Sequence, residues 1–282
     1  MSTTARLAAF VAALSALFGG AALAGAAIGP APEDSPEQMT TENHETETAV
    51  HEEAAHPVRG LAVAEDGLRV VVDGPELRRG RPETLTFRIV DDHGQTVRDF
   101  EVEHEKRMHL ILARRDLTGF QHLHPTQAAD GSWRTSVRLD DAGSYRLFAD
   151  FSRAGEPHTL AADLRVDGSA ELRDLPEPAA TATTGGYEVE LEAGAARPGE
   201  EADLRFTITR DGAPVDPEPY LGAGGHLVAL REGDLAFLHV HPTDDDEAAF
   251  AATFPTAGRY RLFLQFKHDG RVHTAAFTQV VR

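Results

Sequence analysis

The stretch HLILARRDLTGFQHLHP, residues 109–125, has a near twin in HLVALREGDLAFLHVHP, residues 226–242. The two stretches align without a gap. In each copy twelve residues separate the first two histidines, and the chain then reads His-x-His-Pro. The matching histidines are His109 with His226, His122 with His239, and His124 with His241. Three imidazoles that return at identical offsets are the feature of this chain that points most directly to chemistry.

Short alternating apolar runs surround the first copy, and turn residues such as Gly74-Pro75 and Asp130-Gly131 separate them. No stretch shows helical periodicity of useful length. The predicted strands are Leu68–Asp73, Thr84–Val90, His109–Arg114, Phe120–His124, Ser132–Leu139, Tyr145–Phe151 and Thr159–Val166. About seven short strands in about 105 residues are typical of an immunoglobulin-like sandwich.

The same pattern returns later in the chain. Residues 84–90 correspond to residues 203–209, and residues 143–151 correspond to residues 258–266. We therefore expect an all-β protein with two tandem immunoglobulin-like β-sandwich domains that arose by internal duplication. The predicted segments are a signal peptide or N-terminal membrane anchor (1–28), a disordered acidic tether (29–59), a first sandwich (60–167), a linker (168–184) and a second sandwich (185–282).

The N-terminal segment predicts where the protein resides. Residues 8–28 carry no charge and read as a secretory signal, with Ala22-Leu23-Ala24 as a cleavage site, or as an uncleaved anchor. Either interpretation places the rest of the chain outside the cytoplasm, with the membrane contacted through this segment alone. The acidic residues that follow cannot bury enough surface to fold, and His44, His51 and His56 among them could capture metal loosely.

Composition excludes several classes of function. A net charge of −19 without a visible basic patch argues against a nucleic-acid partner. The chain has no cysteine, which excludes disulfides, thiolate zinc sites, iron–sulfur clusters and cysteine nucleophiles. It also has no serine-nucleophile motif, no telling pair of carboxylates and no phosphate-cradling glycine loop, so we expect a protein that is not an enzyme.

The spacing of the histidines predicts that they share one face of a hairpin. Side chains alternate along a strand, so His122 and His124 point the same way. In the second copy Glu232-Gly233 predicts a two-residue turn that would set His226 directly opposite His239. Directly opposed β positions have Cβ atoms about 5 Å apart, from which imidazole nitrogens can converge on one ion.

Three neutral imidazoles with an open position suit Cu(II) or Zn(II). Outside the cytoplasm and without thiolates, we expect copper first and zinc second, in metal resistance, buffering or delivery. The expected partners are the metal ion and another envelope or metal-transport protein. The predicted ligands are His109, His122, His124, His226, His239 and His241.

Four further residues are weaker candidates for this site. His104 could be an extra ligand, and Glu105 could orient His109. His158 and His273 are either fourth ligands or histidines at the edge of the core. The alternative for the whole set is a structural or interaction module of the cell envelope, in which the histidines are packing residues.

The blocks HEKRMHLILARRDLTGFQHLHP (104–125) and AGRYRLFLQFKHDGRVHTAAF (257–277) carry a family resemblance. Over residues 60–282 the chain resembles a group of secreted or membrane-anchored actinobacterial proteins with two immunoglobulin-like domains, which are loosely similar to the YtkA-like family. The resemblance implies a link to copper or other heavy-metal handling. By position it points to His104, Glu105 and the two histidine triads.

Overall fold

The computed structural model describes residues 58–243 and 247–282. In these residues the regular elements are β-strands, and no helix has the length and apolarity to cross a membrane. The described residues all fall within one compact unit. The predicted signal or anchor segment, and the predicted tether up to residue 57, lie outside the described residues.

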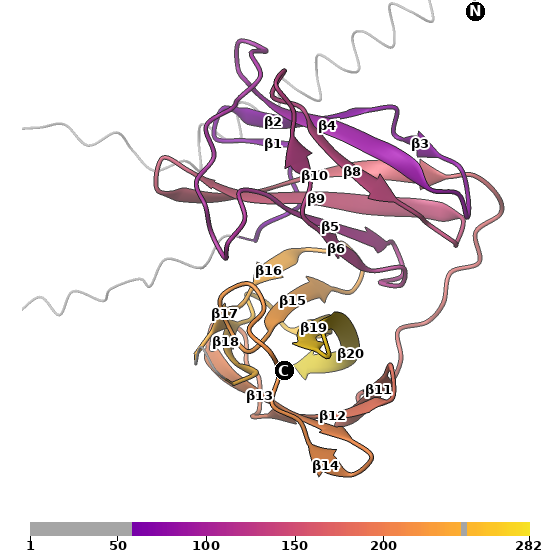
Figure 1. The fold of residues 1–282 in the computed structure, drawn as a ribbon, viewed down its shortest axis with the longest axis vertical. Coiled ribbons are helices and arrows are strands. Elements are labelled where there is room, and N and C mark those ends of the chain that lie inside the picture. Colours follow the sequence, from indigo (N-terminus) through magenta and orange to yellow (C-terminus); the bar gives the residue numbers. More distant parts are fainter. Residues whose placement is uncertain (1–57, 244–246) are drawn as a thin grey trace, which may run out of the picture. The chain divides into compact units, whose positions relative to one another are not determined.

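The first half of the described chain folds into two sheets (Figure 1). One sheet has the strand order β1-β2-β4-β8-β7, and the other has the order β3-β10-β9-β5-β6. The strands are β1 (Ala64–Glu65), β2 (Leu68–Asp73), β3 (Glu76–Leu77), β4 (Glu83–Asp91), β5 (His109–Arg114), β6 (Gln121–Leu123), β7 (Thr126–Gln127), β8 (Trp133–Val137), β9 (Gly143–Arg153) and β10 (Glu156–Val166).

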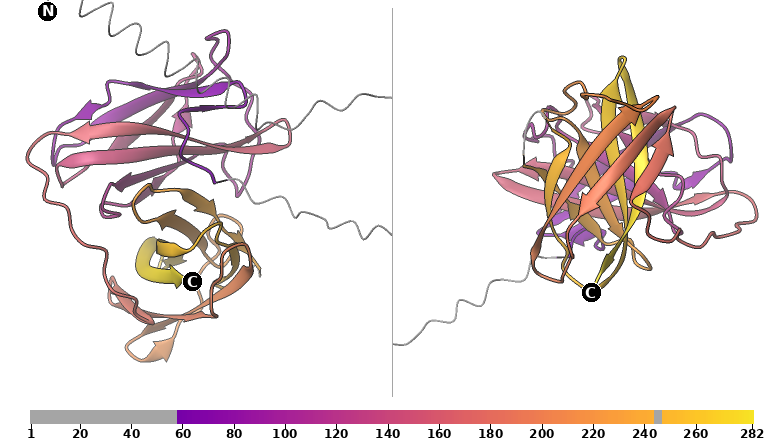
Figure 2. Two further views of the ribbon diagram at one scale, coloured as in Figure 1. Left: turned by 180° about the vertical axis from the view of Figure 1, so that it is seen from behind. Right: turned by 90° about the horizontal axis from the view of Figure 1, so that it is seen from below.

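The second half repeats this plan, as the orange and yellow strands of Figure 2 show. One sheet has the order β11-β12-β13-β18-β17, with β14 paired to β13, and the other has the order β16-β15-β19-β20. The strands are β11 (Thr181–Thr184), β12 (Tyr187–Ala193), β13 (Glu201–Arg210), β14 (Ala213–Pro214), β15 (His226–Arg231), β16 (Phe237–His239), β17 (His241–Pro242), β18 (Ala249–Thr253), β19 (Gly258–His268) and β20 (Arg271–Val281).

This strand order is that of an immunoglobulin sandwich. In the first half β2-β4-β8-β7 take the places of strands A, B, E and D, while β5, β9 and β10 take those of C, F and G. The second half matches with β12-β13-β18-β17 and with β15, β19 and β20. The Tyr145 hydroxyl donates to the Asp141 carbonyl and that of Tyr260 to the Thr256 carbonyl, both at 3.0 Å, which is the tyrosine corner of this fold.

Each sandwich encloses its own apolar core, because alternate side chains of both sheets point inward. Leu85, Phe87 and Leu147 belong to the first core, and Leu204 and Phe250 belong to the second. The predicted all-β fold with two repeated sandwiches is therefore confirmed, and each of the seven strands predicted in the first half is present.

The segment predicted as a linker, residues 168–184, is more structured than expected. Its last four residues form β11, which pairs with β12. Leu175, near its middle, is 7% exposed and packs among residues of both sandwiches. The remaining boundaries of the predicted segments stay predictions.

Candidate metal site

The histidines of the first copy lie on the face of the β5–β6 hairpin that points away from its own core. On β5, Leu110 and Leu112 face the core of the first sandwich. Ile111 and Ala113, on the opposite face, pack in a third apolar cluster that includes residues of the second sandwich. His109 lies two residues before Ile111 and shares its face. Strand β5 is therefore buried on both faces.

The hairpin register differs from the predicted one by two residues. Ile111, rather than His109, pairs with His122, and in the second copy Val228 pairs with His239. The predicted two-residue turn is wrong because the connection between the last paired residues has eight residues in the first copy (113–120) and six in the second (231–236). Both lengths are even, so the described histidines still share one face.

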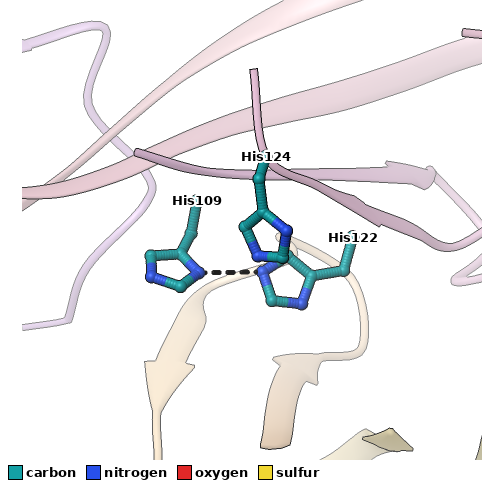
Figure 3. Close-up of side chains that lie close together, drawn as sticks. All are labelled: His109, His122 and His124. Atoms are coloured by element: carbon teal, nitrogen blue, oxygen red, sulfur yellow. Dashed lines mark hydrogen bonds between the residues drawn. The ribbon is translucent and has the colours of Figure 1, made fainter. Parts of the chain in front are cut away.

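The three imidazoles of the first copy converge (Figure 3). His109 Nδ1 lies 3.0 Å from His122 Nε2, and one nitrogen of each ring, including His124, lies within 4.8 Å of the others. His109 and His122 are 3% and 8% exposed. In the described part of the chain, this is the group of side chains that could hold a metal ion.

Two carbonyl oxygens contact the outer nitrogens of this group. His109 Nε2 lies 3.1 Å from the backbone carbonyl oxygen of Glu103. His122 Nδ1 lies 2.6 Å from Oε1 of Gln265, which belongs to strand β19 of the second sandwich. Histidines that bind metals in proteins usually donate their second ring N–H to such an oxygen. The third imidazole differs, since Nε2 of His124 is buried and has no hydrogen-bond partner among the described residues.

Burial favours the neutral form of His122 and of His124 by lowering the pKa of each. Burial, followed by the neighbouring imidazoles of His109 and His124, lowers the pKa of His122 to about 3. Burial, followed by the charges of His109 and Lys106, lowers the pKa of His124 to about 4. Neutral imidazole is the form of histidine that binds a metal.

A tight turn before β5 brings His104 near the group. Glu103 and Lys106 exchange two backbone hydrogen bonds, and His104 and Glu105 between them have φ values of 47° and 64°. The His104 ring lies 6.2 Å from that of His109. Glu105 is exposed, so the acceptor that orients His109 is the Glu103 carbonyl instead. A surface pocket lined by Glu105, Lys106 and other residues reaches His124.

The first histidine of the second copy lies beside this group, with its ring stacked on two of the three imidazoles. The ring centroid of His226 lies 4.7 Å from that of His122 and 5.7 Å from that of His109. The side chains of His239 and His241 lie outside the described part of the structure.

The fourth repeated histidines lie elsewhere. His158 pairs with Phe151 and His273 pairs with Phe266, the latter as predicted. In both pairs the imidazole stacks on the phenylalanine ring with centroids 5.3 Å apart. The structure therefore places both at the edge of a core rather than in the histidine group.

Sequence reasoning missed Gln265 and the Glu103 carbonyl. A signal for Gln265 existed in the repeat: Asp150 in the first copy and Gln265 in the second are polar residues within apolar strands, at matching positions. Asp150 pairs with His109 and Gln265 pairs with His226.

The chain belongs to the family described as Domain of unknown function (DUF8832), whose model matches residues 62–168 and again residues 181–282. The double match agrees with a tandem duplication. No curated protein matches the chain in sequence. The resemblance to actinobacterial or YtkA-like proteins stays a prediction.

Similar solved structures include Salmonella alpha-2-macroglobulin reacted with methylamine, with 15% identity and a TM-score of 0.29 over 80% of this chain and 15% of that one. The Escherichia coli adhesin FdeC has 16% identity and a TM-score of 0.28, over 78% of this chain and 66% of that one. A chimeric titin Z1Z2-Z1Z2 tandem has 15% identity and a TM-score of 0.20, over 76% of this chain and 99% of that one. The chain thus spans about 15% of the length of the Salmonella protein.

Proposed function

We propose that this protein binds a transition-metal ion, copper before zinc, at His109, His122 and His124, and that it acts outside the cytoplasm in metal resistance, buffering or delivery. The observation that carries the proposal is the convergence of three imidazoles within 4.8 Å, two of them buried. Copper, zinc and nickel are the ions that imidazole sites favour. The protein acts as a carrier or buffer rather than as an enzyme.

Copper is placed before zinc because the chain has no cysteine and is expected to act outside the cytoplasm, and imidazole sites without thiolates suit Cu(II). His109 Nδ1, His122 Nε2 and one ring nitrogen of His124 would supply the ligand atoms.

Calorimetric titration of the full chain with Cu(II) and Zn(II) tests the proposal. The background carries His44→Ala, His51→Ala and His56→Ala, since these tether histidines could bind metal themselves. In this background we expect His109→Gln/His122→Gln to weaken copper binding by roughly 100-fold or more, because it removes two ligands.

A matched control removes an exposed histidine outside the group. His93 lies in the turn after β4 and is exposed, so His93→Ala should bind copper as the background does. Equal binding by the background and the double variant would show that the imidazoles do not hold the ion.

The hydrogen bonds of the group support a second candidate, a structural module. The contacts of His109 with His122, and of His122 with Gln265, also suit polar packing between two sandwiches. Under this alternative His109→Gln/His122→Gln unfolds more easily than the background, and adding metal changes the stability of neither protein.

A further inference from the structure

The two sandwiches share a buried apolar interface. Leu175 of the connecting segment joins it, and the remaining residues come from strands and hairpin loops of the two sandwiches. The buried members are Ile111, Ala113, Leu117, Phe148, Ala161, Leu175, Val228, Leu230, Leu235, Phe237 and Phe263. The outer faces of β5 and β15 both contribute residues to this interface.

The interface is reciprocal. The Phe120 ring of the first sandwich stacks on Phe263 of the second at 4.0 Å and 8°. The equivalent Phe237 of the second sandwich packs against Phe148 of the first at 5.5 Å. Because each sandwich presents the same patch to the other, the contact resembles the two-fold interface of a homodimer within one chain. A residue on the outer face of one sandwich therefore meets the same partner position that its equivalent meets in the other sandwich.

The histidine group lies where this interface becomes polar. His226 of the second sandwich is closer to His122, at 4.7 Å between ring centroids, than His109 is, at 5.3 Å. The bond from His122 to Gln265 also crosses between sandwiches. The His122 imidazole therefore contacts two side chains of the second sandwich, His226 and Gln265.

The hydrogen-bond directions fit a cation between His109 and His122. A carbonyl oxygen only accepts hydrogen bonds, so the contact with the Glu103 carbonyl requires a proton on Nε2 of His109. In the neutral imidazole Nδ1 then carries no proton. Gln265 Oε1 likewise requires a proton on Nδ1 of His122, so that Nε2 of the neutral ring carries no proton. The lone pairs of these two unprotonated nitrogens, His109 Nδ1 and His122 Nε2, face each other at 3.0 Å and repel unless a cation lies between them.

The alternative arrangement turns the Gln265 amide over. Its NH₂ group then donates to His122 Nδ1, and its oxygen accepts from the Thr274 hydroxyl, which already lies 3.4 Å from the amide. In this arrangement His122 Nε2 carries the proton and donates to His109, and no ion is needed. The orientation of Gln265 therefore distinguishes a site that holds a cation from one that does not.

We propose that Gln265 of the second sandwich completes the site that the first sandwich begins, so that a bound metal ion ties the two sandwiches together. This rests on the metal-binding function proposed above. His226 packs its ring against that of His122, beside the three ligands. Gln265 is a positioning residue, because its oxygen fixes His122 in the tautomer that turns Nε2 toward the ion.

Copper titration of three variants tests the proposal in the same full-chain background. Gln265→Leu removes the acceptor and should weaken Cu(II) binding by roughly 10–100-fold, with the three histidines of the first sandwich intact. Gln265→Glu keeps an acceptor and should bind at least as tightly as the background. Gln279→Leu is the matched control, since Gln279 lies on β20 and contacts Val280 rather than a histidine; it should leave binding unchanged.

Hydrogen exchange gives a readout that does not depend on affinity. Copper should slow amide exchange in β15 and β19 of the second sandwich as well as in β5 and β6, and Gln265→Leu at saturating copper should abolish the slowing in the second sandwich. Normal copper binding by Gln265→Leu, with protection of the background protein confined to β5 and β6, would overturn the shared site and leave the first proposal standing. No copper binding by the background itself would remove both.

Discussion

Asp116 shows how one carboxylate anchors the hairpin that carries the histidines. Both it and Arg114 have side chains 2% exposed, and Arg114 donates to both carboxylate oxygens. In the second hairpin the matching Arg231 pairs instead with Asp234, one position further along, and these side chains are 17% and 42% exposed. Removing one partner of a buried pair leaves an uncompensated buried charge. We expect Asp116→Asn to lower the free energy of unfolding by about 3–5 kcal/mol, and Asp234→Asn by about 1 kcal/mol or less, in urea titrations at pH 7.

The pH dependence of this difference has a definite sign. Burial alone would raise the pKa of Asp116, but hydrogen bonds from Arg114 and Thr118 outweigh it and hold the pKa well below its ordinary value of 3.8. Because the folded pKa is the lower one, the stabilisation is complete above about pH 4 and is lost as the pH falls below it. The gap between wild type and Asp116→Asn should therefore narrow toward pH 2. A gap that widens in acid would contradict the assignment.

At the same scale, the sequence predicted the histidines better than their partners. His109, His122 and His124 were predictable because a histidine stands at each corresponding position of the second copy, with the same spacing. Gln265 lies 143 positions from His122, and its contact depends on how two sandwiches dock. No local pattern encodes that docking. The Glu103 carbonyl is a backbone atom, so residue identity could not reveal it.

At the scale of the elements, the sequence predicted which face of the β5–β6 hairpin carries the histidines but not the pairing register of its strands. Alternation along the strands predicted which face the histidines share, and that survives because both connections have an even number of residues. The register did not follow, since Glu232-Gly233 looks like a two-residue turn but lies within a six-residue connection. Left-handed residues set these longer connections, with φ near 62° at Leu117 and 63° at Gly119.

Gly119→Ala tests how strictly this connection is built. An added Cβ would lie 2.9 Å from the Tyr145 ring, in a left-handed conformation that itself disfavours alanine. We expect a loss of roughly 2–4 kcal/mol in the free energy of unfolding, from backbone strain and overpacking together. Gly233→Ala is the control, because its φ is 96° but nothing lies within 4 Å of the added Cβ. It should lose about 1–2 kcal/mol, and equal losses in urea titrations would show that the Tyr145 contact does not matter.

At the scale of the whole described chain, the sequence predicted the duplication but not the apolar interface between the two copies. Repeated blocks predicted two sandwiches, each with its own core, and the structure has both. The third apolar cluster was hidden because its members alternate with core residues along the same strands. On β5 every residue is buried, and a sequence pattern cannot distinguish a second sandwich from a thicker core.

The reciprocal phenylalanine contacts predict how the two sandwiches unfold. Phe120 and Phe237 each pack on the other sandwich, so Phe120→Ala/Phe237→Ala should uncouple the sandwiches while leaving both inner cores intact. We expect one calorimetric transition for the wild type and two for the double variant, since each sandwich then unfolds by its own stability. Phe206→Ala is the control: Phe206 lies in the second core, so this variant should unfold at a lower temperature but still in one transition. A single lowered transition for the double variant, like that of the control, would mean that other contacts hold the sandwiches together.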